Sequence, residues 1–148
     1  MTDSISREHR SWNMSRIRGK DTKPEMMLRS LLHRSGLRFR LHTRALPGRP
    51  DMIFAKYRTV VFVHGCFWHR HRGCQFAYHP KSNRLFWKKK FKANVARDQF
   101  VRRALKKIGW KYIIVWECEL KRRPETAASR TAKRIRSAQN LKRDGGRG

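Results

Sequence analysis

Cysteine and histidine residues gather in one short stretch of this chain with the spacing of metal ligands. The stretch VFVHGCFWHRHRGC (61–74) contains two of the three cysteines, and the third follows at Cys118. Cys66, His71 and Cys74 have the spacing C-x4-H-x2-C. Together with Cys118 they form a set of three thiols and one imidazole, which suits a tetrahedral structural Zn²⁺. The spacing therefore predicts a zinc site that ties this loop to the strand before Cys118.

Two alternatives to this ligand set stay open from the residues. His69 or His79 can replace His71 as the fourth ligand, because sequence spacing contains no geometry. Cys66 and Cys118 can also be buried packing residues without a metal, since a reduced cysteine behaves as a small hydrophobic residue. Three cysteines cannot all pair with one another. The cysteine count therefore favours metal binding or reduced thiols over a secreted disulfide framework.

An acidic residue beside an apolar strand is informative in a chain this basic. Asp51 opens the apolar stretch DMIFA, and His64 follows the end of the stretch TVVFV. Adjacent strands would place both residues on one edge of a sheet. A carboxylate, a backbone carbonyl and an imidazole at such an edge can hold Mg²⁺ and a water against a phosphodiester. Glu25 can reach the same edge; alternatively, Asp51 caps a turn and Glu25 completes a capping box.

Large aromatic residues lie among these polar positions. Phe67 and Trp68 separate Cys66 from His69, and Trp87 begins a later helix. Aromatic side chains on a loop are normally core residues, with the loop folded over them. On a strongly basic protein they have a second use as wedges, because an apolar side chain inserted between base pairs unstacks a step most cheaply at a mispair.

The charge of the chain indicates a nucleic acid as its partner. Its 148 residues include 38 Lys and Arg against 10 Asp and Glu, which gives a formal net charge of +28. Such a charge repels itself in a compact protein and calls for a polyanion. The basic residues are interspersed with apolar ones, as on a folded basic surface. No apolar run has the length of a signal sequence or a membrane span, so we expect a soluble, intracellular protein.

The elements that must position these residues follow from hydrophobic periodicity. The stretch DTKPEMMLRSLLHRSG (21–36) predicts a helix, in which Thr22 and Glu25 have capping-box spacing and Gly36 ends the helix. Strands are predicted over 37–41, 51–55, 59–63 and 112–120, a long helix over 82–110, and a frayed helix with a basic tail over 122–148. We therefore expect one α/β domain over 21–121, preceded by a basic arm over 1–20.

The motifs resemble a known family, the very short patch repair endonucleases, bacterial enzymes that nick DNA at T:G mismatches. The resemblance spans roughly residues 11–121. It is carried by NMSRIRGKDTKPE (13–25), LPGRPD (46–51), VFVHGCFWH (61–69), FWKKKFKANVARD (86–98) and GWKYIIVWECEL (109–120). The resemblance implies a restriction-endonuclease-like fold of the PD-(D/E)xK type, which is a central mixed sheet flanked by helices, with a structural zinc site.

The resemblance also implies roles for residues at the predicted sheet edge. Asp51 and the main-chain carbonyl of Val63 would be the protein ligands of a catalytic Mg²⁺. Glu25 would make an outer-sphere contact to metal-bound water. His64 would stand where many proteins of this fold have a lysine. These four positions would form the metal side of the catalytic site.

Further roles are implied for the loop that follows. His69 would transfer a proton near the scissile phosphate, with Asp98 as its orienting partner. The zinc ligands would be Cys66, His71, Cys74 and Cys118. The aromatic residues that intercalate beside the mismatch from the major-groove side would be Phe67, Trp68 and Trp87. The basic N-terminal arm would cross the other groove.

The resulting prediction is a Mg²⁺-dependent endonuclease that nicks one strand of duplex DNA 5′ to the thymine of a T:G mismatch. A zinc-stabilised DNA-binding module without catalysis and a restriction-type nuclease stay as alternatives. The resemblance further implies a monomer in the bacterial cytoplasm that is associated with the nucleoid through DNA. The mismatch-repair machinery and a companion cytosine methyltransferase would be its partners besides double-stranded DNA.

Overall fold

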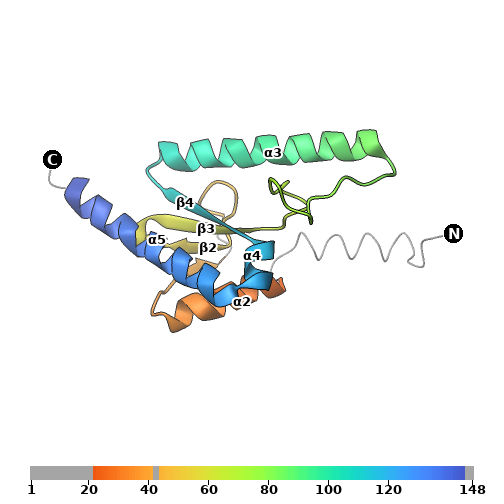
Figure 1. The fold of residues 1–148 in the computed structure, drawn as a ribbon. Helices are drawn as coiled ribbons and strands as arrows, with labels where there is room; N and C mark the ends of the chain where they lie inside the picture. Colours follow the sequence, from red (N-terminus) through yellow and green to blue (C-terminus); the bar gives the residue numbers. More distant parts are fainter. Residues whose placement is uncertain (1–21, 42–43, 146–148) are drawn as a thin grey trace.

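The structure, a computed structural model, describes residues 22–41 and 44–145 (Figure 1). The predicted basic arm over 1–20 lies outside the described residues. In the described part of the chain, no helix combines the length and the apolar character that crossing a membrane requires.

A mixed four-stranded sheet with the strand order β1-β2-β3-β4 forms the centre of the fold. Its strands are β1 (Arg40–Leu41), β2 (Met52–Phe54), β3 (Thr59–His64) and β4 (Lys111–Trp116). The pairs β1-β2 and β2-β3 are antiparallel, whereas β3 and β4 run parallel. A parallel pair needs a long crossover connection, which contains the helix α3 (Arg84–Lys107). The four predicted strands and the predicted α/β class are confirmed, although β1 is shorter than the alternation over 37–41 predicted.

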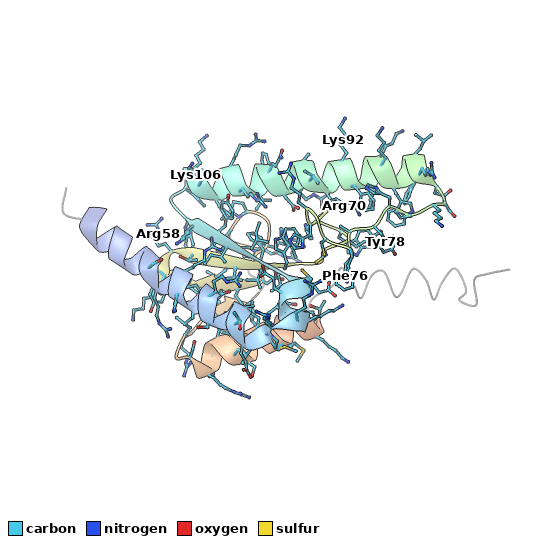
Figure 2. The ribbon with its side chains drawn as sticks, in the orientation of Figure 1. Arg58, Arg70, Phe76, Tyr78, Lys92 and Lys106 are labelled. Carbon is cyan, nitrogen blue, oxygen red and sulfur yellow. The ribbon has the colours of Figure 1, made fainter. Side chains whose placement is uncertain are left out.

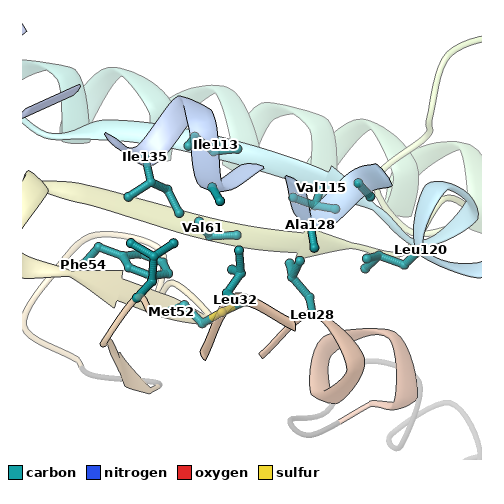
Figure 3. Packing of buried hydrophobic residues seen from close by; sticks show 13 residues of the cluster. Leu28, Leu32, Met52, Phe54, Val61, Ile113, Val115, Leu120, Ala128 and Ile135 are labelled. Carbon is teal, nitrogen blue, oxygen red and sulfur yellow. The ribbon is translucent and has the colours of Figure 1, made fainter. Parts of the chain in front are cut away.

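Helices cover both faces of the sheet (Figure 1). One face packs against α2 (Lys23–Arg34) and α5 (Pro124–Gly145), and the other face packs against α3. The larger core lies between the sheet and the α2–α5 layer (Figure 3). Its most buried members include Leu28, Leu32, Met52, Phe54, Val61, Ile113, Leu120 and Ile135. The smaller core under α3 contains Ile53, Val60, Phe62 and Leu105. The alternation of Met52, Ile53 and Phe54 between the two cores is the period-two pattern of a strand buried on both faces.

The predicted capping box at the start of α2 is confirmed. The Glu25 backbone N–H donates to Thr22 Oγ1 over 3.4 Å, and the Thr22 backbone N–H donates to Glu25 Oε2 over 3.3 Å. These reciprocal bonds satisfy two donors at the helix terminus. They also fix the backbone at Glu25, which is 2% exposed at the start of the helix.

The prediction of one strand over 112–120 is wrong at its C-terminal end. The strand β4 ends at Trp116, and the short helix α4 (Glu117–Arg122) follows directly. Glu117 and Glu119 lie in the first turn of α4, where carboxylates stabilise the positive end of a helix. This turn buries the Cys118 side chain, which is 6% exposed, instead of extending it along the sheet.

The C-terminal helix is not the frayed element that its scarcity of apolar residues predicted. Along α5, Ala127, Ala128, Ala132 and Ile135 are all buried in the larger core. Alanine side chains let a helix approach its neighbours closely, so a few small residues are enough to seat α5 against α2 and the sheet. The Arg136 Nη2 group also donates to the Ser35 carbonyl over 2.5 Å, which ties α5 to the end of α2.

Candidate active site

Asp51 lies just before β2, and the backbone of β3 holds it in place. The Asp51 N–H donates to the Val61 carbonyl over 3.1 Å, and the Val63 N–H donates to Asp51 Oδ2 over 2.6 Å. On its other side Asp51 is hydrogen-bonded to the Glu25 side chain, which α2 brings over the sheet edge. The structure therefore brings together the three residues that were predicted around one metal: Asp51, Val63 and Glu25.

The Glu25 carboxyl group perturbs Asp51 electrostatically. Burial, followed by the hydrogen bond and the negative charge of Glu25, raises the pKa of Asp51 to about 8, against the opposing effects of the Val63 N–H and of Arg29. Arg29 Nη2 lies 3.0 Å from Glu25 Oε1 and balances part of the charge. Two adjacent carboxyl groups offer oxygen donors of the kind that bind a divalent cation. The residues present therefore fit Mg²⁺.

A histidine pair and an aspartate form a second group beside the end of β3. The rings of His64 and His69 stack with 3.7 Å between their centroids and 8° between their planes. His69 Nδ1 lies 2.7 Å from Asp98 Oδ2, on α3. When Nδ1 carries the proton toward this carboxylate, Nε2 of His69 is left as the ring nitrogen that can accept or donate a proton. The predicted pairing of His69 with Asp98 is thus present in the structure.

His64 differs from its stacked neighbour in its surroundings. The His64 residue is 7% exposed, and burial, followed by the adjacent His69 ring, lowers the pKa of His64 to about 3. His64 is therefore neutral at pH 7, and its ring supports the stacked ring of His69.

Both groups line one cavity of about 720 Å³. Its lining includes six further polar side chains that the sequence analysis did not single out: Lys23, Arg49, Asn94, Arg97, Arg102 and Glu117. Glu117 is the most informative of these, because the whole chain has only 10 acidic residues. Its Oε2 lies 3.4 Å from the position that a Cβ on Gly65 would occupy, so this glycine leaves room for the carboxylate. The scarcity of acidic residues was the signal that could have found Glu117.

The predicted thiol–imidazole group also comes together in the structure. One ligand atom from each of its members lies within 4.8 Å of all the others: Cys66, His71, Cys74 and Cys118. Ligands of a tetrahedral Zn²⁺ at about 2.3 Å from sulfur to metal lie about 3.8 Å apart, so the donors present fit this ion. The Cys118 Sγ to His71 Nδ1 distance of 3.5 Å matches that spacing.

The structure distinguishes among the three candidate imidazoles. His71 stacks on Trp116 with 4.0 Å between ring centroids, which holds its ring toward Cys118. His69 faces Asp98 instead, and the His79 ring nitrogens lie 3.4 and 3.5 Å from Arg70 Nη2. His71 is the imidazole that lies among the thiols.

The pKa values of the three thiols in this group are shifted in different directions. Burial raises the pKa of Cys66 to about 12 and also raises the pKa of Cys118. For Cys74, burial acts in the same direction, but hydrogen bonds from the Phe76 backbone and the neighbouring thiols outweigh it and lower the pKa. A metal binds cysteine in its thiolate form. Three clustered thiolates repel one another, so a bound cation stabilises them together.

The predicted wedge residues belong to an aromatic cluster, which we define as Phe67, Trp68, Tyr78, Trp87 and Phe91. The Phe67 ring lies at its centre, with centroids of the other four rings 5.0 to 5.4 Å away. Trp68 is only 6% exposed, and its carbonyl accepts a hydrogen bond from Asn94 Nδ2 over 3.2 Å. Phe67 and Trp87 are half-buried. Trp68 therefore packs as a core residue here, whereas Phe67 and Trp87 keep part of their surface accessible.

Carboxylates and a histidine–aspartate pair share one cavity in a strongly basic protein, an arrangement that suits a nuclease. Residues 2–75 match the family model of the DNA mismatch endonuclease Vsr. The chain belongs to this family and is a DNA endonuclease, as the resemblance to the very short patch repair enzymes predicted.

Full-length relatives agree with the family assignment. The chain is 52% identical over 120 residues to the type II nicking enzyme V.XorIIP of Xanthomonas oryzae pv. oryzae, covering 81% of this chain and 88% of the relative. It is 46% identical over 121 residues to the type II nicking enzyme V.NmeAIP of Neisseria meningitidis serogroup A, covering 82% and 86%. It is 41% identical over 135 residues to the DNA mismatch endonuclease Vsr of Escherichia coli K12, covering 91% and 86%.

Proposed function

We propose that this endonuclease hydrolyses one strand of duplex DNA on the 5′ side of the thymine in a T:G mismatch, in a reaction that requires Mg²⁺. The observation that carries the proposal is the Asp51–Glu25 carboxyl pair, which lines the same cavity as the His69–Asp98 pair. The relative named a DNA mismatch endonuclease supports the substrate, and those named nicking enzymes support cleavage of a single strand. The central mixed sheet between helices supports a fold of the PD-(D/E)xK type.

In this proposal Asp51 and the Val63 carbonyl hold the Mg²⁺, and Glu25 lies beside them as an outer contact. A bound divalent cation neutralises phosphate charge and lowers the pKa of water. His69 holds or moves a proton at Nε2, because its Nδ1 is engaged by Asp98. His64 stays neutral and keeps the His69 ring in place.

The second metal centre in this proposal is structural. Cys66, His71, Cys74 and Cys118 bind one Zn²⁺, which joins the loop after β3 to the start of α4. The loop carries Phe67 between the first zinc ligand and the catalytic histidine. Zinc binding therefore limits the movement of the aromatic cluster relative to the catalytic cavity.

The aromatic cluster is proposed to inspect the base step. Phe67, Trp68 and Trp87 insert beside the mismatch, with the half-buried Phe67 and Trp87 leading and Trp68 behind them. Unstacking is least costly at a mispair, so insertion favours T:G over T:A duplex.

Residues 21–121 are proposed as the endonuclease domain, with residues 1–20 as a DNA-contacting arm. Mismatch-repair proteins and a cytosine methyltransferase are proposed as further partners of the monomeric enzyme.

The test uses T:G and T:A duplexes of identical flanking sequence, with each strand labelled separately, with and without Mg²⁺. We expect one nick, in the thymine strand of the T:G duplex, and only with Mg²⁺. Asp51→Asn should lose nicking and keep DNA binding, whereas Glu125→Gln, a matched loss of one exposed carboxylate on α5, should behave as wild type. Cleavage of both strands would support a restriction-type nuclease. Binding without cleavage would support a DNA-binding module.

A further inference from the structure

Arg70 lies between the loop that follows β3 and the helix α3, against the aromatic cluster (Figure 2). Its Nη1 donates to the Phe67 carbonyl over 3.2 Å and to the Tyr78 carbonyl over 3.1 Å. Its Nη2 donates to the Ala77 carbonyl over 2.8 Å. One guanidinium group thus joins the start of the loop to the segment that follows the zinc ligands.

The same guanidinium also packs on the long helix. Arg70 Cζ lies 3.8 Å from the centroid of the Phe91 ring and 5.7 Å from that of Phe67. A planar cation stacked on an aromatic face is attracted by the electrons of the ring. Arg70 therefore connects three segments, the loop at Phe67, the segment at 77–78 and α3 at Phe91, through a single side chain.

These contacts differ from those of a cation that binds phosphate. In the described structure, N–H groups on both terminal nitrogens of Arg70 are directed at backbone carbonyls of its own chain. Its residue is half-buried, whereas Arg72, two positions later in the same loop, is exposed. The positive φ of 53° at Arg70 is uncommon for a residue with a side chain. The residue with this uncommon backbone conformation is the one whose guanidinium contacts all three segments.

We propose that Arg70 is a positioning residue for mismatch recognition, which fixes Phe67 and its carbonyl against α3 so that the aromatic cluster meets the base step already ordered. This inference rests on the proposed function, because it assumes that the cluster inspects the mispair. An ordered wedge loses less conformational freedom when it inserts than a mobile one does. Arg70 therefore acts on discrimination between T:G and T:A duplex, and the catalytic groups act on hydrolysis.

Lysine cannot replace arginine in this arrangement. A lysine ammonium is a compact point charge, so it lacks the flat face that stacks on Phe91 and the fork that reaches several carbonyls together. Arg70→Lys therefore keeps the charge and removes the geometry. Arg72→Lys makes the same chemical change at an exposed position of the same loop and is the matched control.

The experiment compares wild type, Arg70→Lys and Arg72→Lys in their zinc-bound forms, with zinc content and melting temperature measured first. Hydrogen exchange of residues 65–80 in the DNA-free proteins reports the anchoring directly. We expect faster exchange in this segment for Arg70→Lys alone. In single-turnover nicking, the preference of Arg70→Lys for T:G over T:A duplex should fall about tenfold, which is the effect of losing one charge-assisted hydrogen bond. Its binding to T:A duplex should be nearly unchanged.

Several outcomes would overturn the inference. Unchanged exchange and unchanged T:G preference in Arg70→Lys would show that Arg70 positions nothing. Equal loss on both duplexes with a lowered melting temperature would make it an ordinary folding residue. If Arg70→Lys does not fold, Phe91→Leu removes the ring beneath the guanidinium, and an unchanged preference in that variant would also refute the inference. A wild-type enzyme without T:G preference would instead refute the proposed function, while the exchange measurement would still report the anchoring.

Discussion

Replacing Asp51 with asparagine should stabilise the Mg²⁺-free protein while it abolishes cleavage. The buried Asp51 carboxyl holds its proton to a pKa of about 8 in the folded chain, because of burial and then of Glu25, against an ordinary value of 3.8. Between these two values the unfolded chain is ionised and the folded chain keeps a proton. Folding stability therefore falls as pH rises from about 4 to 8 and levels off above 8.

The size of the effect follows from the same two values. At pH 7 the penalty is the difference between 7 and 3.8 multiplied by about 1.4 kcal/mol, or roughly 4 kcal/mol. Asp51 is partly exposed to the cavity, where water screens the charge and reduces this penalty. We therefore expect Asp51→Asn to gain about 2 kcal/mol at pH 7 to 8. The amide also keeps an oxygen that can accept the Val63 N–H hydrogen bond.

Urea unfolding of wild type and Asp51→Asn between pH 5 and 8.5 measures this gain, in buffer without Mg²⁺ and with the zinc retained. The difference between the two proteins isolates Asp51, since His64, whose lowered pKa makes stability fall below pH 6.5, contributes equally to both. The advantage of the variant should grow with pH and disappear near pH 4. Glu125→Gln should show no such trend. An Asp51→Asn variant that is less stable than wild type at pH 8 would refute this electrostatic account of the site.

Three further outcomes follow from the geometry. Cys118→Ala should lower bound zinc from about one ion per chain and lower stability, as metal analysis and thermal unfolding will show; full zinc retention would contradict the ligand set. His69→Ala should reduce single-turnover nicking by about 10² to 10⁴ with DNA binding retained, and a wild-type rate would remove its proton-transfer role. Trp68→Ala should cost roughly 3 to 5 kcal/mol in urea unfolding, because the side chain is 6% exposed, and unchanged stability would show that it does not pack as a core residue.

The wedge hypothesis makes a separate demand on the half-buried aromatic residues. Since Trp68 packs inside the cluster, its truncation changes stability and recognition together. Trp87 at the edge of the cluster gives the cleaner test, because its loss should change mismatch preference with a smaller cost in stability. The sequence analysis assigned the same role to Phe67, Trp68 and Trp87. Their different burial in the structure distinguishes Trp68 from the other two.

Local patterns in the sequence determined much of this protein. Period-two and helical periodicities predicted the order of strands and helices, because these patterns depend on neighbours within one or two turns. The capping box of Thr22 and Glu25 is likewise a contact across three positions. The cysteine spacing predicted a group of thiols and an imidazole, and the motif HGCFWH predicted the family, since both are properties of short segments.

Tertiary structure decided which of these groups meet. The choice of His71 over His69 and His79 depends on α4 turning Cys118 toward the loop, across 47 positions of the chain. The pairing of His69 with Asp98 spans 29 positions, and Glu25 meets Asp51 only because α2 packs over the sheet edge. The packing of α5 against the larger core also buried its alanine side chains, although apolar residues are few in this helix. Such contacts depend on how whole elements pack together, which periodicity within a single element does not specify.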